Sequence, residues 1–217
     1  MGAFIFLRKI APFVIYWIRQ HFDRVVNLKN MSGNKNIEYL HLPQSVNIPI
    51  ETYESAIGQY FIGYADELTF GNGTSAWARL YNPPDSGVNL FVNVWTVTDI
   101  SSSPFRAQFW FNAEAPGTPS ESALVTPSNT AFRPVPTPRV KLQLASDVSG
   151  SPSGGVKAFV RRGEPEVTLV ESENGKLIFP PGGNFLVFLS LAEGALEPAA
   201  GRIAFGWWEE KIGYRCR

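Results

Sequence analysis

Apolar and polar residues alternate along most of the chain after Glu51, and an alternation with period two predicts β-strands. Between Phe105 and Asn112, one face of the expected strand carries phenylalanine and alanine, whereas the other carries Trp110 among polar side chains. The segments Val140–Leu144 and Val156–Arg161 alternate in the same way. Strands of this kind are half-buried, with one face on a core and the other in solvent.

Three further segments are apolar on both faces, which predicts strands in the middle of a sheet. They are Leu90–Thr98, Phe185–Leu191 and Ile203–Trp208. Shorter strands are expected at Gln59–Tyr64 and Ala76–Tyr81.

Turn-forming residues separate these segments, and the pair Asn174-Gly175 is typical of a two-residue hairpin turn. We therefore expect Val167–Glu173 and Lys176–Phe179 to pair as a hairpin. Eight or nine short strands at regular spacing predict an all-β fold, an antiparallel β-sandwich of jelly-roll type. Residues 51–212 are expected to form this single domain, preceded by a linker at 31–50 and a separate N-terminal extension at 1–30.

Residues 113–139 form a long segment rich in proline, serine and threonine. Two interpretations remain open, because long loops in compact domains are commonly functional or disordered. The segment either crosses over one end of the sandwich or offers a contact surface in an assembly, with Pro134–Pro138 extended and ordered in advance.

The first thirty residues differ from the rest, since five basic residues stand against Asp23 alone. Their apolar run, Ile10–Ile18, is too short to cross a bilayer, which needs about 20 residues. No small-residue cleavage site of a signal peptide follows it. Two expectations remain: a segment that lies on a membrane or a partner, or an upstream extension with the true start at Met31.

Groups for catalysis are scarce in the predicted domain. The two histidines, His21 and His41, both precede it, so a histidine-based triad inside it is excluded. Cys216, near the end of the chain, is the single cysteine, which excludes an internal disulfide and a thiolate metal site. We therefore expect no catalytic, cofactor-binding or metal-binding residues.

Adjacent carboxylates occur as three pairs: Asp66 with Glu67, Glu171 with Glu173, and Glu209 with Glu210. A glycosidase needs two carboxyl groups that face each other across a cleft. Neighbouring strand residues point to opposite faces, and Glu171 and Glu173 flank the expected hairpin turn. A hydrolase that uses Glu171 or Glu209 remains a remote alternative.

The tryptophans are the more informative residues, because exposed aromatic rings serve as sugar-stacking platforms and as protein interfaces. Trp110 is expected on the polar face of its strand, and one of Trp207 and Trp208 should point to solvent. Arg133 and Arg139 are further candidate contact residues that could form a basic spot with Arg161-Arg162. The chain has a net charge of zero, and its excess of basic residues lies in 1–30, so nucleic-acid binding is not expected.

Several short runs of the chain together resemble an uncharacterised family, a domain of unknown function, of small β-sandwich proteins from spore-forming Gram-positive bacteria. The resemblance covers residues 58 to 210 or so and implies no activity, ligand or catalytic residue. The runs that carry it are Tyr60–Gly63, Leu68–Thr74, Ala76–Pro84, Gly87–Val94, Phe179–Phe185 and Ala204–Glu210.

These observations favour a non-catalytic structural or interaction module that associates with itself or with other proteins of a bacterial surface, spore or phage-derived assembly. The alternative is a carbohydrate-binding module that uses Trp110 with Trp207 or Trp208. Unpaired backbone groups at sandwich edges are the expected means of chain-to-chain pairing. Membrane contact is expected only if residues 1–30 are part of the protein.

Overall fold

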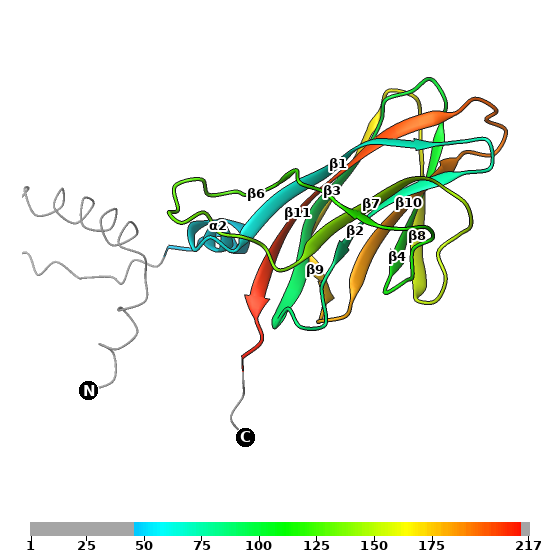
Figure 1. Cartoon of the computed structure of the whole chain (residues 1–217). Helices are drawn as coiled ribbons and strands as arrows, with labels where there is room; N and C mark the ends of the chain where they lie inside the picture. Colours follow the sequence, from blue (N-terminus) through cyan, green and yellow to red (C-terminus); the bar gives the residue numbers. More distant parts are fainter. Residues whose placement is uncertain (1–45, 214–217) are drawn as a thin grey trace, which may run out of the picture. The chain divides into compact units, whose positions relative to one another are not determined.

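The computed structural model describes residues 46–213, and the part from Ile48 onward forms one compact unit (Figure 1). It contains one short helix and eleven strands. In chain order they are α2 (Ile50–Ala56), β1 (Tyr60–Phe70), β2 (Ser75–Tyr81), β3 (Val88–Asp99), β4 (Phe105–Phe111), β5 (Ser120–Glu121), β6 (Val125–Pro127), β7 (Lys141–Val148), β8 (Val156–Gly163), β9 (Thr168–Phe179), β10 (Asn184–Leu191) and β11 (Ala199–Lys211).

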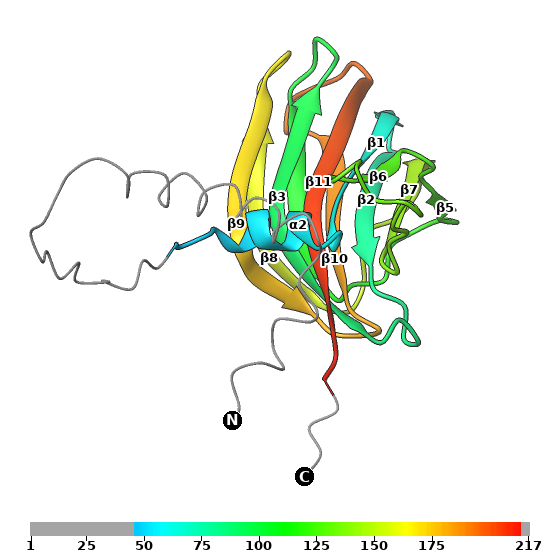
Figure 2. The same cartoon turned by 90° about the vertical axis from the view of Figure 1, so that its left-hand side faces the viewer.

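The strands form two antiparallel sheets that face each other, as Figure 2 shows. Sheet A has the order β6-β1-β11-β3-β9, and sheet B has the order β5-β7-β2-β10-β4-β8. The predicted all-β sandwich is therefore confirmed, although the strand number of eight or nine was too low. The jelly-roll pattern of connections stays a prediction, and the extension at 1–30 lies outside the described residues.

Alternating side chains of both sheets meet in one aromatic core. On β4 the inward residues Phe105, Ala107 and Phe109 are fully buried, as the sequence pattern predicts. The ring of Trp95 from sheet A lies with its centre 4.3 Å from that of Phe109 in sheet B. Burial of apolar surface of this kind stabilises the fold by roughly 25 cal/mol per Å².

The predicted hairpin at Asn174-Gly175 is wrong, because β9 runs through both residues as one strand along β3. Both residues have positive φ angles, 51° and 72°. Such angles occur in β-bulges as well as in hairpin turns. The pairing with β3 shifts at this point. Gly175 is required there because a Cβ atom would collide with the ring of Trp208.

The Pro-rich segment covers one edge of the sandwich and contributes two short strands that the sequence pattern did not reveal. Its strand β5 pairs with β7 of sheet B, and its strand β6 pairs with β1 of sheet A. Backbone hydrogen bonds from Ser122 to Leu142 and from Tyr64 to Leu124 continue this cover. The segment thus crosses from one sheet to the other, as the first interpretation expects, but along one edge of the sandwich and not over its end. A role as a contact surface stays a prediction.

The helix α2 was not predicted, since only seven residues form it and their apolar spacing has no clear helical period. It follows Pro49, whose carbonyl accepts hydrogen bonds from the backbone N–H groups of Thr52 and Tyr53. Proline is favoured near helix starts because it needs no N–H partner there. Glu54 is its single buried residue.

A buried asparagine fixes the turn between β9 and β10. The side-chain nitrogen of Asn82 donates to the carbonyl oxygens of Val88, at 2.8 Å, and Phe179, at 3.0 Å. The backbone of Asn82 bonds in addition to Gly182 and Gly183 of the turn. One side chain therefore ties β2 of sheet B to two strands of sheet A.

We predict that Asn82→Ala lowers the free energy of unfolding by about 3 kcal/mol, because two buried carbonyl groups lose their donor. Chemical denaturation measures this change. The control Asn89→Ala removes a half-buried amide from β3 and should cost less than about 0.5 kcal/mol. Equal effects of the two substitutions would contradict the structural role of Asn82.

Candidate functional site

The side of the sandwich opposite the Pro-rich segment is an open edge, which we define as strands β8 and β9. Within the described residues, no further strand follows β8 in sheet B or β9 in sheet A. Figure 2 shows the two strands together at one side, away from β5 and β6. Edge strands present unpaired backbone N–H and C=O groups to a partner.

Apolar side chains lie exposed on both strands of the open edge. The exposed fraction is 39% for Val160 on β8 and 60% for Val170 on β9. Val156 and Ile178 are more than half exposed as well. Unpaired backbone and exposed β-branched residues together are typical of a surface that can bind another strand.

Both strands also carry features that limit indiscriminate pairing. The pairing of β8 with β4 shifts at Ala158, and that of β9 with β3 shifts at Asn174-Gly175. Between these bulges, the stretches Phe159–Gly163 and Thr168–Ser172 pair regularly with their neighbours. Bulges and charged side chains on edge strands disfavour aggregation. Beside its bulge, each edge strand has one regular stretch of five residues.

Charged residues of the open edge lie at the seam between β8 and β9. The indole nitrogen of Trp95 donates to Glu173 at 3.1 Å, and the amine of Lys176 lies 3.9 Å from the other carboxylate oxygen. The guanidinium of Arg161 lies 5.1 Å from the centre of the Phe159 ring. These charged groups thus lie where the aromatic core borders the solvent, between the two edge strands.

The outer face of sheet A continues the apolar character of the open edge. One row across this face runs from Tyr64 through Ala204 and Thr96 to Val170. Tyr64 is 40% exposed, and Ile62 beside it is 46% exposed. Hydrophobic surface of this kind favours contact with other proteins.

Both tryptophans near the chain end are buried, so the expectation that one of them points to solvent is wrong. Trp207 lies in the core, while Trp208 lies on the outer face of sheet A. There the ring of Trp208 stacks on Phe91, with 5.3 Å between ring centres, and Gly175 packs against it. Neither ring offers a free face to a ligand.

Trp110 is the one tryptophan, among the residues that the structure describes, that stays partly exposed. As predicted, it lies on the outer face of its sheet. The amine of Lys157 stands 5.2 Å from the centre of its ring. In the same row across sheet B, Arg79 donates to the side-chain oxygen of Gln143 at 2.9 Å.

The four arginines of the suggested basic spot do not come together. Arg133 and Arg139 belong to the segment that leads into β7, whereas Arg161 and Arg162 lie on β8 at the other edge of sheet B. Arg133 donates to the carbonyl oxygens of Thr130 and Phe132. Arg139 donates through its guanidinium to the carbonyl of Ser86, so both have local structural contacts.

Two of the paired carboxylates, Glu209 and Asp66, make hydrogen bonds within the fold. Glu209 is buried and accepts the backbone N–H groups of Arg139 and Val140 and the indole N–H of Trp207. Burial raises the pKa of Glu209, while these hydrogen bonds act in the opposite direction. Asp66 pairs with Arg202, and this hydrogen bond lowers the pKa of Asp66.

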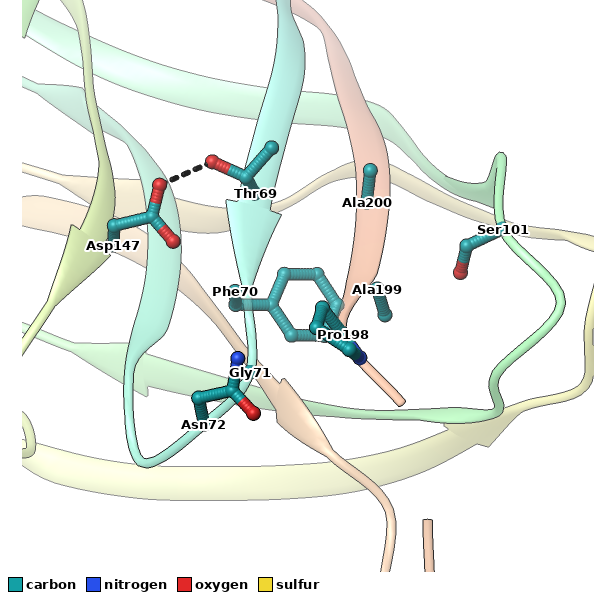
Figure 3. Close-up of a pocket in the computed structure, with 9 residues that line it drawn as sticks. All are labelled: Thr69, Phe70, Gly71, Asn72, Ser101, Asp147, Pro198, Ala199 and Ala200. Atoms are coloured by element: carbon teal, nitrogen blue, oxygen red, sulfur yellow. Dashed lines mark hydrogen bonds between the residues drawn. The ribbon is translucent and has the colours of Figure 1, made fainter. Parts of the chain in front are cut away.

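The hollows of the described surface are shallow. One of them, of about 280 Å³, lies between the end of β1 and the start of β11. Its carboxylate, Asp147, accepts a hydrogen bond from the hydroxyl of Thr69 (Figure 3) and another from the hydroxyl of Thr74. This hollow is lined by Thr69, Phe70, Gly71, Asn72, Ser101, Asp147, Pro198, Ala199 and Ala200. Asp147 is the single carboxylate among them, whereas glycoside hydrolysis needs two carboxyl groups.

Sequence reasoning missed two groups. The open edge could not be found because strand order is not readable from local alternation, although the pair Arg161-Arg162 drew attention to β8. Glu54 was missed because it lies on the unexpected helix α2, where it is 4% exposed. Burial, with a smaller repulsion from Glu210, raises the pKa of Glu54 from 4.5 to about 7.

We predict that stability falls as the pH rises from 4.5 to about 7, because the folded chain keeps a proton on Glu54 that the unfolded chain has lost. Glu54→Gln should flatten this part of the profile. Chemical denaturation across the window measures it. The control Glu51→Gln, on the same helix, should keep the slope of the wild type, and a wild-type slope in Glu54→Gln would refute the assignment.

The described residues also bear on metal binding and on membrane crossing. Residues 46–213 contain no cluster of three or more histidine, cysteine, aspartate or glutamate side chains that could hold a metal ion. No helix in this part of the chain has the length and apolar character that crossing a bilayer requires. Cys216 lies outside the described residues.

Comparison with known proteins identifies a family without an assigned activity. The model of a family of unknown function (DUF6143) matches residues 33–214. No curated protein and no solved structure matches the chain. The chain therefore belongs to this family of unknown function, which confirms the expected membership of an uncharacterised family.

Proposed function

We propose that this member of a family of unknown function is a non-catalytic structural module that associates with further copies of itself, in a bacterial surface, spore or phage-derived assembly. The open edge is the observation that carries the proposal. One edge of the sandwich is partly covered by the short strands β5 and β6, whereas β8 and β9, at the other edge, have no strand on their outer side in the described chain.

Strand pairing gives such an edge both affinity and register. Each new backbone hydrogen bond contributes about 1 kcal/mol net, and the exposed valines lose contact with water at the same time. The bulges restrict pairing to the regular stretches, which favours a defined partner over open-ended aggregation. In an assembly built from one protein, the partner of each open edge is a second copy of the same chain.

We predict that the full chain forms dimers or larger species as its concentration rises, and that Val160→Lys/Val170→Lys shifts the equilibrium to monomer. Sedimentation equilibrium under reducing conditions measures both, since reduction prevents linkage through Cys216. The control Ile62→Lys adds one positive charge, half of the change in the double variant, to β1, at a similarly exposed apolar position away from the open edge.

Ile62→Lys should associate like the wild type. A wild type that stays strictly monomeric at high concentration would overturn the proposal. Equal loss of association in Ile62→Lys would place the contact on the outer face of sheet A instead of the open edge.

Carbohydrate binding is the second candidate, now restricted to Trp110. The observation that favours it is the row of Trp110, Arg79 and Gln143 on the outer face of sheet B, which joins an aromatic ring to side chains that hydrogen-bond hydroxyl groups. A sugar that stacks on Trp110 would have to displace Lys157 from its ring.

If the protein binds glycans, Trp110→Ala should weaken binding about tenfold, the equivalent of one well-placed stacking contact. A glycan array followed by calorimetry on any binding sugar measures this. Tyr64→Ala, which removes an exposed aromatic ring from the other sheet, is the control. An array without binding to the wild type would eliminate this candidate.

A further inference from the structure

The open edges of two copies can join around a two-fold axis in two ways that keep their strands aligned. An axis perpendicular to the sheets places β8 beside the partner's β8 and β9 beside the partner's β9. An axis parallel to the strands places β8 of each copy beside β9 of the other. The two arrangements differ in which charges meet.

The charges of the two edge strands are opposite. β8 carries Lys157, Arg161 and Arg162 and no acidic residue, whereas β9 carries Glu171 and Glu173 against Lys176. Pairing β8 with the partner's β8 would bring three cations on each side together, and like charges across an interface repel each other and disfavour association. Pairing β8 with the partner's β9 brings cations to acidic groups.

The strand directions also suit the second arrangement. β3 and β4 follow each other and run in opposite directions, β8 is antiparallel to β4, and β9 is antiparallel to β3. It follows that β8 and β9 run in opposite directions. A rotation about an axis parallel to the strands preserves the direction of each strand, so β8 and the partner's β9 meet as an antiparallel pair.

The heights of the regular stretches agree as well. Phe159–Gly163 and Thr168–Ser172 extend from the two ends of the same short turn, Glu164–Val167. A two-fold rotation makes no shift along its axis, so the stretches of two copies face each other. Arg161 and Glu171 pair with the inward residues Ala107 and Trp95, and therefore share the inner face of the combined sheet.

We propose that two copies of this chain form a reciprocal dimer in which β8 of each copy pairs antiparallel with β9 of the other. Sheet A of one copy thereby continues into sheet B of its partner, twice per dimer. This inference rests on the proposed self-association and adds which strand meets which. It also explains why β8 is basic while β9 is acidic.

The test exchanges the charges of the two strands in the full chain. Arg161→Glu/Arg162→Glu leaves Lys157 against two acidic residues on β8, and Glu171→Lys leaves Glu173 against two basic residues on β9. Each variant alone should dimerise at least about tenfold more weakly than the wild type. An equimolar mixture should regain dimers, because both strand pairs of the mixed dimer are again of opposite charge.

The control Arg133→Glu/Lys141→Glu changes the net charge by the same amount as Arg161→Glu/Arg162→Glu, but near the covered edge. It should dimerise like the wild type. Circular dichroism and thermal denaturation establish that all variants fold. Sedimentation velocity measures the dimers, with one variant carrying a fluorescent label to count mixed species. Added salt should weaken the wild-type dimer, because it screens attraction.

The possible outcomes distinguish the reciprocal dimer from self-association as such. If Arg161→Glu/Arg162→Glu dimerises more tightly than the wild type while Glu171→Lys is unchanged, like strands meet and the reciprocal dimer is wrong, although self-association stands. If the mixture fails to recover dimers that both variants lost, the reciprocal pairing is likewise wrong. If the wild type is monomeric, both proposals fall.

Discussion

The structure depends on how a two-sheet sandwich satisfies the backbone groups at its edges. Alternating side chains close the two sheets on an aromatic core, but hydrogen bonding within a sheet cannot satisfy its outermost strands. At one side the Pro-rich segment supplies β5 and β6, and Glu209 accepts the N–H groups of Arg139 and Val140 where that segment enters β7. At the other side β8 and β9 each pair with one neighbour, β4 and β3, and have no further strand on their outer side in the described chain. This asymmetry is the basis of the proposed function.

The buried polar groups support this view of a scaffold. Asn82 joins the sheets, Glu209 anchors the covering segment, and Glu173 accepts the indole N–H of Trp95 at the open seam. Each acts on the chain's own backbone or core. The shallow hollow beside Asp147 presents one carboxylate, and both of its oxygens are engaged by threonine hydroxyls.

Local patterns predicted most of the fold, because the alternation in Phe105–Phe111 shows which face meets the core, and the apolar residues on both faces of Phe185–Leu191 indicate a strand covered on both sides. Two features were beyond such patterns. The strands β5 and β6 have two and three residues, too few to show a period. Asn174-Gly175 adopts positive φ angles, and the same dihedrals serve a turn or a bulge, so only the long-range pairing with β3 distinguishes them. Burial of Trp208 likewise depends on Phe91 and Gly175, which are distant in the sequence.

Residue-resolved hydrogen exchange of the full chain at low and at high concentration tests the central claim most directly, because strand pairing protects the amides that it engages. The account predicts slower exchange at high concentration in β8 and β9, and unchanged exchange in β5 and β6 at the covered edge. Protection that is independent of concentration at β8 and β9, or that rises elsewhere instead, would contradict it.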